Sequence, residues 1–141
     1  MQDDAPMPDD GPPPADDESA YELLQRGRAL MQQRHNAQAA VVLERAARLE
    51  PGRGSILEAL ARATYNAGQH PRALEVFEAL LEVDPSSGYG HYGLAQSLRK
   101  VGRAPEAVTH LRLACALDPA SPVYRAALAR AEASLPTSAD D

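Results

Sequence analysis

Four histidines and one cysteine are among the side chains of this 141-residue chain that could bind a metal or attack a substrate. They are His35, His70, His91, His110 and Cys115. A zinc site or a metalloprotease would need a second cysteine, an HExxH helix or a carboxylate cluster beside them, and none accompanies them. We therefore expect ordinary surface or half-buried histidines and a buried Cys115. The sequence predicts no enzyme, no metal site and no cofactor.

Phosphate and nucleic-acid binding are also not expected. Gly52 and Gly54 flank a helix break, and no GK[ST] motif follows them. The charge of residues 1–18 is −7 and that of the last two residues is −2, so residues 19–139 carry +3 while the whole chain carries −6. So small a basic surplus, without stacking aromatics beside it, argues against nucleic acid.

The composition favours a helical protein. Hydrophobic residues make up 44% of the chain and aromatic residues only 4%, so Ala, Leu and Val must fill the core. No apolar run approaches the roughly 20 residues that span a bilayer, and no secretory signal begins the sequence. With a single cysteine, these features predict a cytoplasmic protein without membrane insertion. Arginine outnumbers the one lysine, Lys100, as expected for a GC-rich bacterium.

A repeat of 34 residues connects prolines, small residues and large apolar residues. The matching sets are Pro51, Pro85 and Pro119; Ala39, Ala73 and Ala107; Leu43, Phe77 and Leu111; Gly27, Ala61 and Ala95; and Leu23, Leu57 and His91. Small, large and proline positions in a fixed order at this period are typical of the tetratricopeptide repeat. The sequence resembles that family over about 20–119, with one further helix to about 135.

Helix-boundary residues agree with the repeat. Ser19 with Glu22, and Ser55 with Glu58, match capping boxes that start first helices. Gly68 and Gly102 fall where those helices should stop, and Arg34 stands at the equivalent place in the first repeat. Pro71 and Pro105 suit the first turn of the second helices.

The resemblance implies an all-α fold, a right-handed α-solenoid of three helical hairpins and a C-terminal capping helix. The expected repeats are about 20–53, 54–87 and 88–121, and the capping helix is about 122–135. Together they form a domain over 19–135, which is needed because one hairpin alone leaves an apolar face in water. An acidic, proline-rich tail at 1–18 and a short tail at 136–141 are expected to be disordered.

In this family the first helices of successive repeats line a concave groove. The resemblance assigns equivalent positions of the 34-residue repeat to that groove. It thereby predicts a partner-binding surface of Tyr21, Arg28, Arg62, Tyr65, Asn66, Tyr89, Tyr92, Gln96, Arg99, Lys100 and Arg130. Tyrosine and arginine often dominate binding energy at protein interfaces, and arginine pairs with carboxylates. The resemblance thus implies a non-catalytic adaptor that binds an acidic peptide or helix. The alternative for this surface is a solvated face that binds nothing.

The sequence is also compatible with other functions. The positions that clamp a terminal carboxylate in chaperone-binding members hold Leu24, Arg28, Ala59, Tyr89 and Gly93, and only Arg28 fits. A self-assembling structural subunit is the alternative function, and the expected state is a monomer or a weak homodimer. The acidic tail either reaches into the groove and competes with the partner or only increases solubility.

Overall fold

The computed structural model describes residues 18–136, which form seven α-helices and no β-strand. The helices are α1 (Ala20–Gln32), α2 (Asn36–Leu49), α3 (Gly54–Asn66), α4 (His70–Val83), α5 (Gly88–Lys100), α6 (Ala104–Leu117) and α7 (Pro122–Ala133). Apart from Glu18 and Pro136, the two predicted tails lie outside the described residues.

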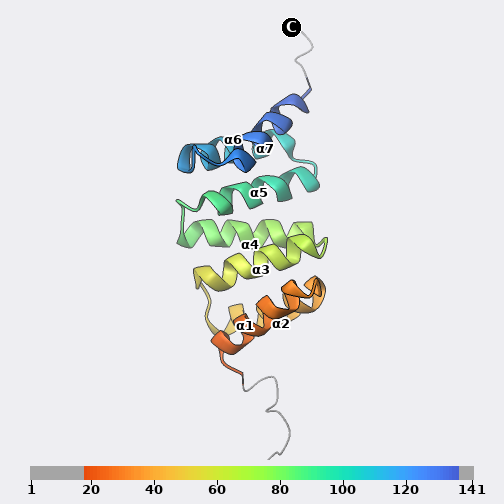
Figure 1. Ribbon diagram of the computed structural model, residues 1–141, viewed down its shortest axis with the longest axis vertical. Coiled ribbons are helices and arrows are strands. Elements are labelled where there is room, and N and C mark those ends of the chain that lie inside the picture. Colours follow the sequence, from red (N-terminus) through yellow and green to blue (C-terminus); the bar gives the residue numbers. More distant parts are fainter. Residues whose placement is uncertain (1–17, 137–141) are drawn as a thin grey trace, which may run out of the picture.

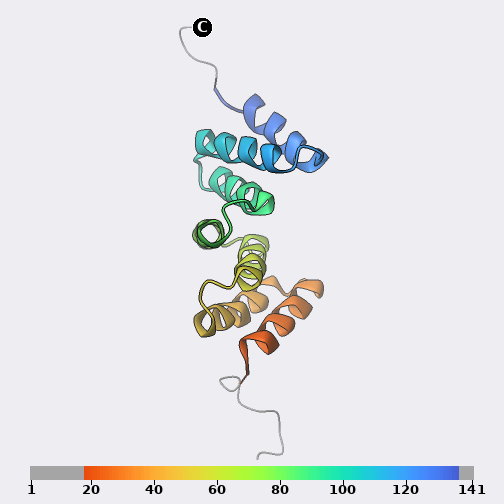
Figure 2. The same cartoon turned by 90° about the vertical axis from the view of Figure 1, so that its left-hand side faces the viewer.

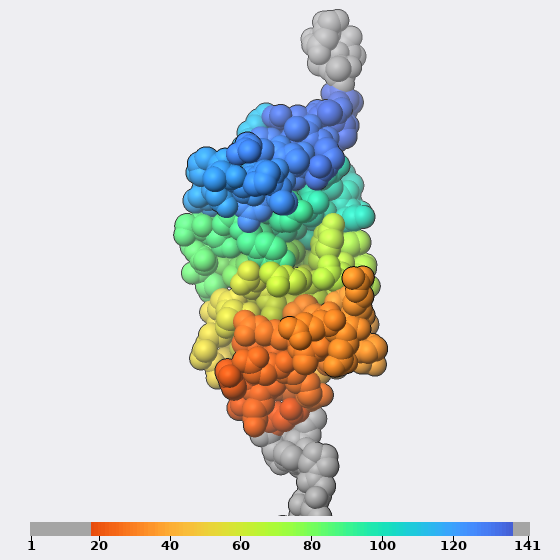
Figure 3. Space-filling view, viewed as in Figure 1, coloured from red at the N-terminus to blue at the C-terminus, as the bar shows by residue number. Residues whose placement is uncertain are grey.

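The helices stack in chain order along the long axis of the molecule, as two perpendicular views show (Figures 1 and 2). Each helix packs against the next one in sequence, and α3 also contacts both α1 and α5. In the space-filling view the segments form successive bands in the same order (Figure 3). The molecule is therefore the predicted helical-repeat solenoid of three hairpins followed by a seventh helix.

Small side chains allow the two helices of each hairpin to approach closely. All five alanines of the two small-residue sets are fully buried, and Gly27 is also buried (Ala39, Ala61, Ala73, Ala95 and Ala107). Large apolar side chains are fully buried beside them, including Leu43, Phe77 and Leu111. Burial of such side chains is the main source of stability in a repeat array, since no hairpin can bury its apolar face alone.

Side-chain hydrogen bonds cap the starts of three of the seven helices. Ser19 and Glu22 form the reciprocal capping box of α1. The hydroxyl groups of Ser87 and Ser121 accept backbone N–H groups at the starts of α5 and α7.

The predicted capping box of Ser55 and Glu58 is wrong. α3 begins at Gly54, and its N-cap residue Arg53 makes no side-chain capping hydrogen bond. Ser55 therefore lies inside the first helical turn instead of before it, where a capping side chain must lie. Glu58 instead pairs with Arg62, one turn further along the helix, at 3.6 Å.

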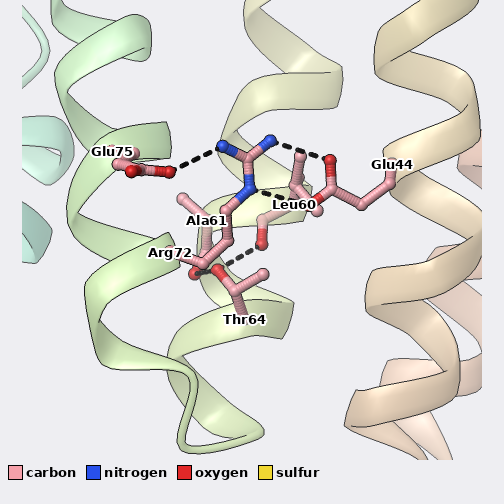
Figure 4. A network of polar contacts seen from close by, with 6 residues as sticks. All are labelled: Glu44, Leu60, Ala61, Thr64, Arg72 and Glu75. Atoms are coloured by element: carbon pink, nitrogen blue, oxygen red, sulfur yellow. Dashed lines mark hydrogen bonds and ion pairs between the residues drawn. The ribbon is translucent and has the colours of Figure 1, made fainter.

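Arg72 on α4 joins two repeats through the even-numbered helices (Figure 4). Its Nε and Nη2 donate to the carboxylate of Glu44 on α2 at 2.8 Å each, and its Nη1 donates to Glu75 at 3.0 Å. The hydrogen bond from Arg72 holds the pKa of the Glu44 carboxyl below its usual range. Nearby, the buried hydroxyl of Thr64 donates to two carbonyl groups of its own helix.

Candidate functional site

A hollow lies between α3 and α5 on the side of the odd-numbered helices. This central pocket has a volume of about 180 Å³. Its lining residues are Arg62, Tyr65, Asn66, Phe77, Tyr89, Tyr92, Gly93 and Gln96.

Two further hollows adjoin the central pocket. The Arg28 hollow, toward α1, measures about 320 Å³ and is lined by Arg28, Met31, Gln32, Arg62 and Asn66. The Lys100 hollow, at the C-terminal ends of α3 and α5, measures about 390 Å³ and is lined by Tyr65, Gln96, Arg99 and Lys100. Each shares two residues with the central pocket, so the three hollows form one continuous surface, called the groove below.

The floor of the central pocket exists because Gly93 has no side chain. A Cβ atom at this position would lie 2.1 Å from the ring of Phe77, far inside van der Waals contact. Phe77 comes from α4 and is 1% exposed, so its ring passes under α5 and reaches the groove from behind. The pocket therefore has an apolar floor.

Aromatic rings form one wall of the pocket and continue it toward α7. The rings of Phe77 and Tyr89 meet edge to face at 5.8 Å, and those of Tyr89 and Tyr92 lie 6.5 Å apart. Tyr124, on α7, stacks on Tyr92 at 5.2 Å. Aromatic pairs in these geometries hold one another in place, so the wall is preformed.

Arg62 is held in a defined position at the edge of the pocket. Its Nε donates to the hydroxyl of Tyr89 at 3.1 Å, its guanidinium carbon lies 5.0 Å from the centre of that ring, and Glu58 pairs with it. The hydrogen bond to Tyr89 is the main cause that raises the pKa of Arg62. The guanidinium thus remains charged while its rotamer is restricted.

The other groove cations differ from Arg62 in this respect. Arg28, Arg99 and Lys100 form no salt bridge with any residue in the part of the chain that the structure describes. Burial is the main cause that raises the pKa of the Tyr65 hydroxyl, and the positive charge of Arg99 opposes the shift, so the two side chains interact. The groove therefore carries positive charge on both sides of an apolar pocket.

Nine of the eleven residues predicted for the binding surface line the groove. They are Arg28, Arg62, Tyr65, Asn66, Tyr89, Tyr92, Gln96, Arg99 and Lys100. Tyr21, which is 68% exposed at the start of α1, and Arg130 on α7 line none of the three hollows. The structure does not bring these two together with the others.

Three residues of the site were missed by the phase argument: Phe77, Gly93 and Tyr124. The sequence contains a signal for Phe77 and Gly93. The chain has one phenylalanine, in the second repeat, and Gly93 in the third repeat is the only glycine among the equivalent positions of the three repeats. The equivalents of Gly93 are Gln25 and Ala59. Tyr124 gives no such signal, because its contact with Tyr92 depends on the angle at which α7 packs.

The chemically active residues outside the groove do not form a metal site among residues 18–136. No three His, Cys, Asp or Glu side chains gather there. His91 and His110 form a pair whose Nδ1 atoms lie 3.1 Å apart, and Cys115 is a free, half-buried cysteine. None of the helices from α1 to α7 is long and apolar enough to cross a membrane.

Solved structures support the fold. The chain superposes on MamA from Desulfovibrio magneticus RS-1 with a TM-score of 0.78 at 21% identity, over 82% of this chain and 65% of the other. It thus spans less than two thirds of the length of that solved MamA chain. The first tetratricopeptide repeat domain of Spaghetti, bound to an HSP90 peptide, gives 0.77 at 13% identity, over 82% and 91%. The Yersinia enterocolitica chaperone SycD, with a YopD peptide, gives 0.69 at 18% identity, over 80% and 86%.

The sequence comparisons identify the repeat itself. No curated protein shows significant sequence similarity to the chain. A family model described as tetratricopeptide repeat matches residues 24–71 and 58–122, which is most of the seven-helix array. The chain belongs to the tetratricopeptide repeat family.

Proposed function

We propose that this protein is a non-catalytic adaptor that binds a peptide or helix of a partner protein in the groove. The observation that carries the proposal is the apolar central pocket with cations on both sides that no described carboxylate neutralises. A partner with an apolar side chain between acidic residues matches that pattern. The cytoplasm is the compartment that we propose for it.

Preorganisation supports binding at this surface. The Tyr89–Tyr92 wall and Arg62 are already held by contacts within the protein, so ordering them on binding costs little entropy. Tyrosine and arginine in a partly enclosed pocket are also the side chains that most often dominate interface energy.

The structural relatives agree with this kind of ligand. The Spaghetti domain is bound to the HSP90 peptide SRMEEVD, which contains three acidic residues, and SycD is in complex with a peptide of the translocator YopD. A peptide ligand for the groove is therefore consistent with the use of similar folds, while the identities of those ligands belong to those proteins.

The test is capture of partners from an extract of the source cell with the wild-type full chain and two variants of it. Arg99→Glu reverses a charge in the groove, and Arg48→Glu reverses the charge of an exposed arginine on α2 that lines no part of it. We expect Arg99→Glu to lose specific partners about tenfold or more, equivalent to roughly 1.4 kcal/mol, and Arg48→Glu to retain them.

Equal retention by both variants would show that the groove is not the binding surface. Circular dichroism must first show that both variants are as helical as wild type.

Light scattering on the same samples tests the alternative of a self-assembling subunit, which a monomer at high concentration would contradict. We expect a monomer.

A further inference from the structure

We propose that residues 3–10 of this chain, Asp-Asp-Ala-Pro-Met-Pro-Asp-Asp, bind in the groove and compete there with the partner. The inference rests on the proposed function, because it makes a segment of the protein an internal ligand of the same surface. The acidic N-terminal tail then regulates the groove and does more than increase solubility.

The segment has the same pattern of chemistry as the groove, with opposite charge. Met7 is its one large apolar side chain, and one aspartate pair lies on each side of it. Pro6 and Pro8 restrict the backbone around Met7 to extended conformations, which lowers the entropy lost on binding. Methionine is unbranched and makes favourable contacts with aromatic rings, so it suits a pocket walled by tyrosines and floored by Phe77.

The charges of the groove lie where the segment needs them. With Met7 in the central pocket, one aspartate pair faces the Arg28 hollow and the other faces the Lys100 hollow. At about 3.1 Å per residue in an extended proline-rich chain, Asp4 and Asp9 lie roughly 9 and 6 Å from Met7. Neighbouring packed helices are about 8–10 Å apart, which matches the step from the pocket to the Arg28 hollow. One helical turn rises about 5.4 Å, which matches the step along α3 and α5 to the Lys100 hollow.

The connection to α1 is long enough. Glu18, where the described chain begins, is held by Arg26, whose Nε donates to its carboxylate at 3.1 Å. The residues from Met7 to Glu18 span up to about 34 Å when extended. The pocket lies two helix rows from α1, about 20 Å away, and helices of this length measure about 20 Å. The segment can therefore reach the pocket without moving a helix.

Three arginines outside the groove are already paired with carboxylates, so they compete poorly for the segment. Arg72 is bound to Glu44 and Glu75, Arg103 to Glu106, and Arg112 to Glu132. The groove combines unpaired cations with an apolar pocket. Because the segment is tethered, its effective concentration at the groove is in the millimolar range, so even weak docking is populated.

Paramagnetic NMR on the full chain tests the docking directly. A nitroxide is attached at Ala5→Cys in a Cys115→Ala background, which leaves Met7 and the aspartates intact. We expect strong broadening of the amide signals of Tyr65, Gly93 and Gln96, and little on α2 and α6. The effect should vanish in about 1 M salt, where the Debye length is about 3 Å, and should fall in the Met7→Ser variant. Broadening that is weak everywhere, or unchanged by both treatments, overturns the proposal.

A binding assay separates this inference from the proposed function. The probe is a fluorescent synthetic peptide of residues 1–12, added to full-length protein. We expect a variant with Asp3, Asp4, Asp9 and Asp10 all changed to Asn to bind the probe several-fold more tightly than wild type, because its own tail no longer competes. Arg99→Glu should weaken binding to that variant.

If the probe binds neither protein while partner capture still depends on Arg99, the segment is not a ligand and the adaptor function stands. If the probe binds through Arg99 while partners ignore that residue, the adaptor function is wrong and the docking stands.

Discussion

At the scale of single side chains, His91 and His110 are in contact between α5 and α6. Nε2 of His91 is 3.0 Å from the carbonyl oxygen of Pro85, so it carries the proton and donates. Nδ1 of His91 then accepts from Nδ1–H of His110 at 3.1 Å. Burial is the main cause that holds the pKa of His110 below its usual range. The charge of His91 adds to this shift, and Glu106 opposes it. The polar residue at a usually apolar position thus has a hydrogen-bond partner at each ring nitrogen.

Acidification should therefore destabilise the protein through this pair. The pKa of His110 is lower in the folded than in the unfolded state, so the unfolded chain binds the proton more readily as the pH falls below about 6.5. We expect the urea midpoint to decrease between pH 7 and pH 5, and His110→Gln to flatten that decrease. His35→Gln, at an exposed histidine of the first hairpin turn, is the control and should keep the wild-type slope. An unchanged slope in His110→Gln would contradict the assignment.

The three hairpin turns show how one element can be built from different residues. Gly68 and Gly102 have φ angles of 83° and 86°, and Arg34 adopts 64° at the equivalent position. The amide of Arg34 donates to Met31 at 2.9 Å, as that of Gly68 donates to Tyr65 at 3.0 Å. The first turn thus has the same form as the second, although a side chain at a positive φ costs about 1 kcal/mol or more.

Relieving that cost should stabilise the first hairpin. We expect Arg34→Gly to raise the free energy of unfolding by about 1 kcal/mol, and Gly68→Ala to lower it by a similar amount. No atom lies within 4 Å of a Cβ built at Gly68, so the second change reports on backbone conformation without a steric clash. Urea unfolding measures both. A neutral or destabilising Arg34→Gly would show that the arginine side chain makes a compensating contribution.

Stability is unevenly distributed over the whole molecule. The central helix α3 buries seven residues, whereas α7 buries only Ala127 and Ala131. α3 contacts α1, α2, α4 and α5, while α7 packs mainly against α6. In an array of nearest-neighbour contacts, an end helix can open without disturbing the rest. The groove is built on α3 and α5, so its central pocket lies between the helices with the most buried residues.

Hydrogen exchange should reproduce this gradient. We expect amides of α7 to exchange fastest, those of α1 to be intermediate and those of α3, α4 and α5 to be slowest, because opening the centre requires loss of contacts on both sides. Mass spectrometry of exchanged, digested protein measures this order. Equal protection in all seven helices would instead indicate that the molecule opens only as one cooperative unit.

The sequence by itself determined the helices, their order and most of the groove. The spacing of Pro51, Pro85 and Pro119 and the turn positions Gly68 and Gly102 act locally, so helix boundaries follow from short stretches of chain. The 34-residue period then places equivalent side chains on the same face, which is why nine of the predicted residues line the groove. Ser55 is the exception among the predicted caps, since the exact first residue of a helix varies by one or two positions.

Only the tertiary structure decided what the groove is made of. The ring of Phe77 reaches it because Gly93 leaves room between α4 and α5, and Tyr124 joins the wall because α7 packs where its ring meets Tyr92. It also decided that Arg62 is held by Tyr89 while Arg99 has no described salt-bridge partner. These relations join residues from different helices, and they depend on the distances and angles between helix axes, which periodicity along one chain does not specify.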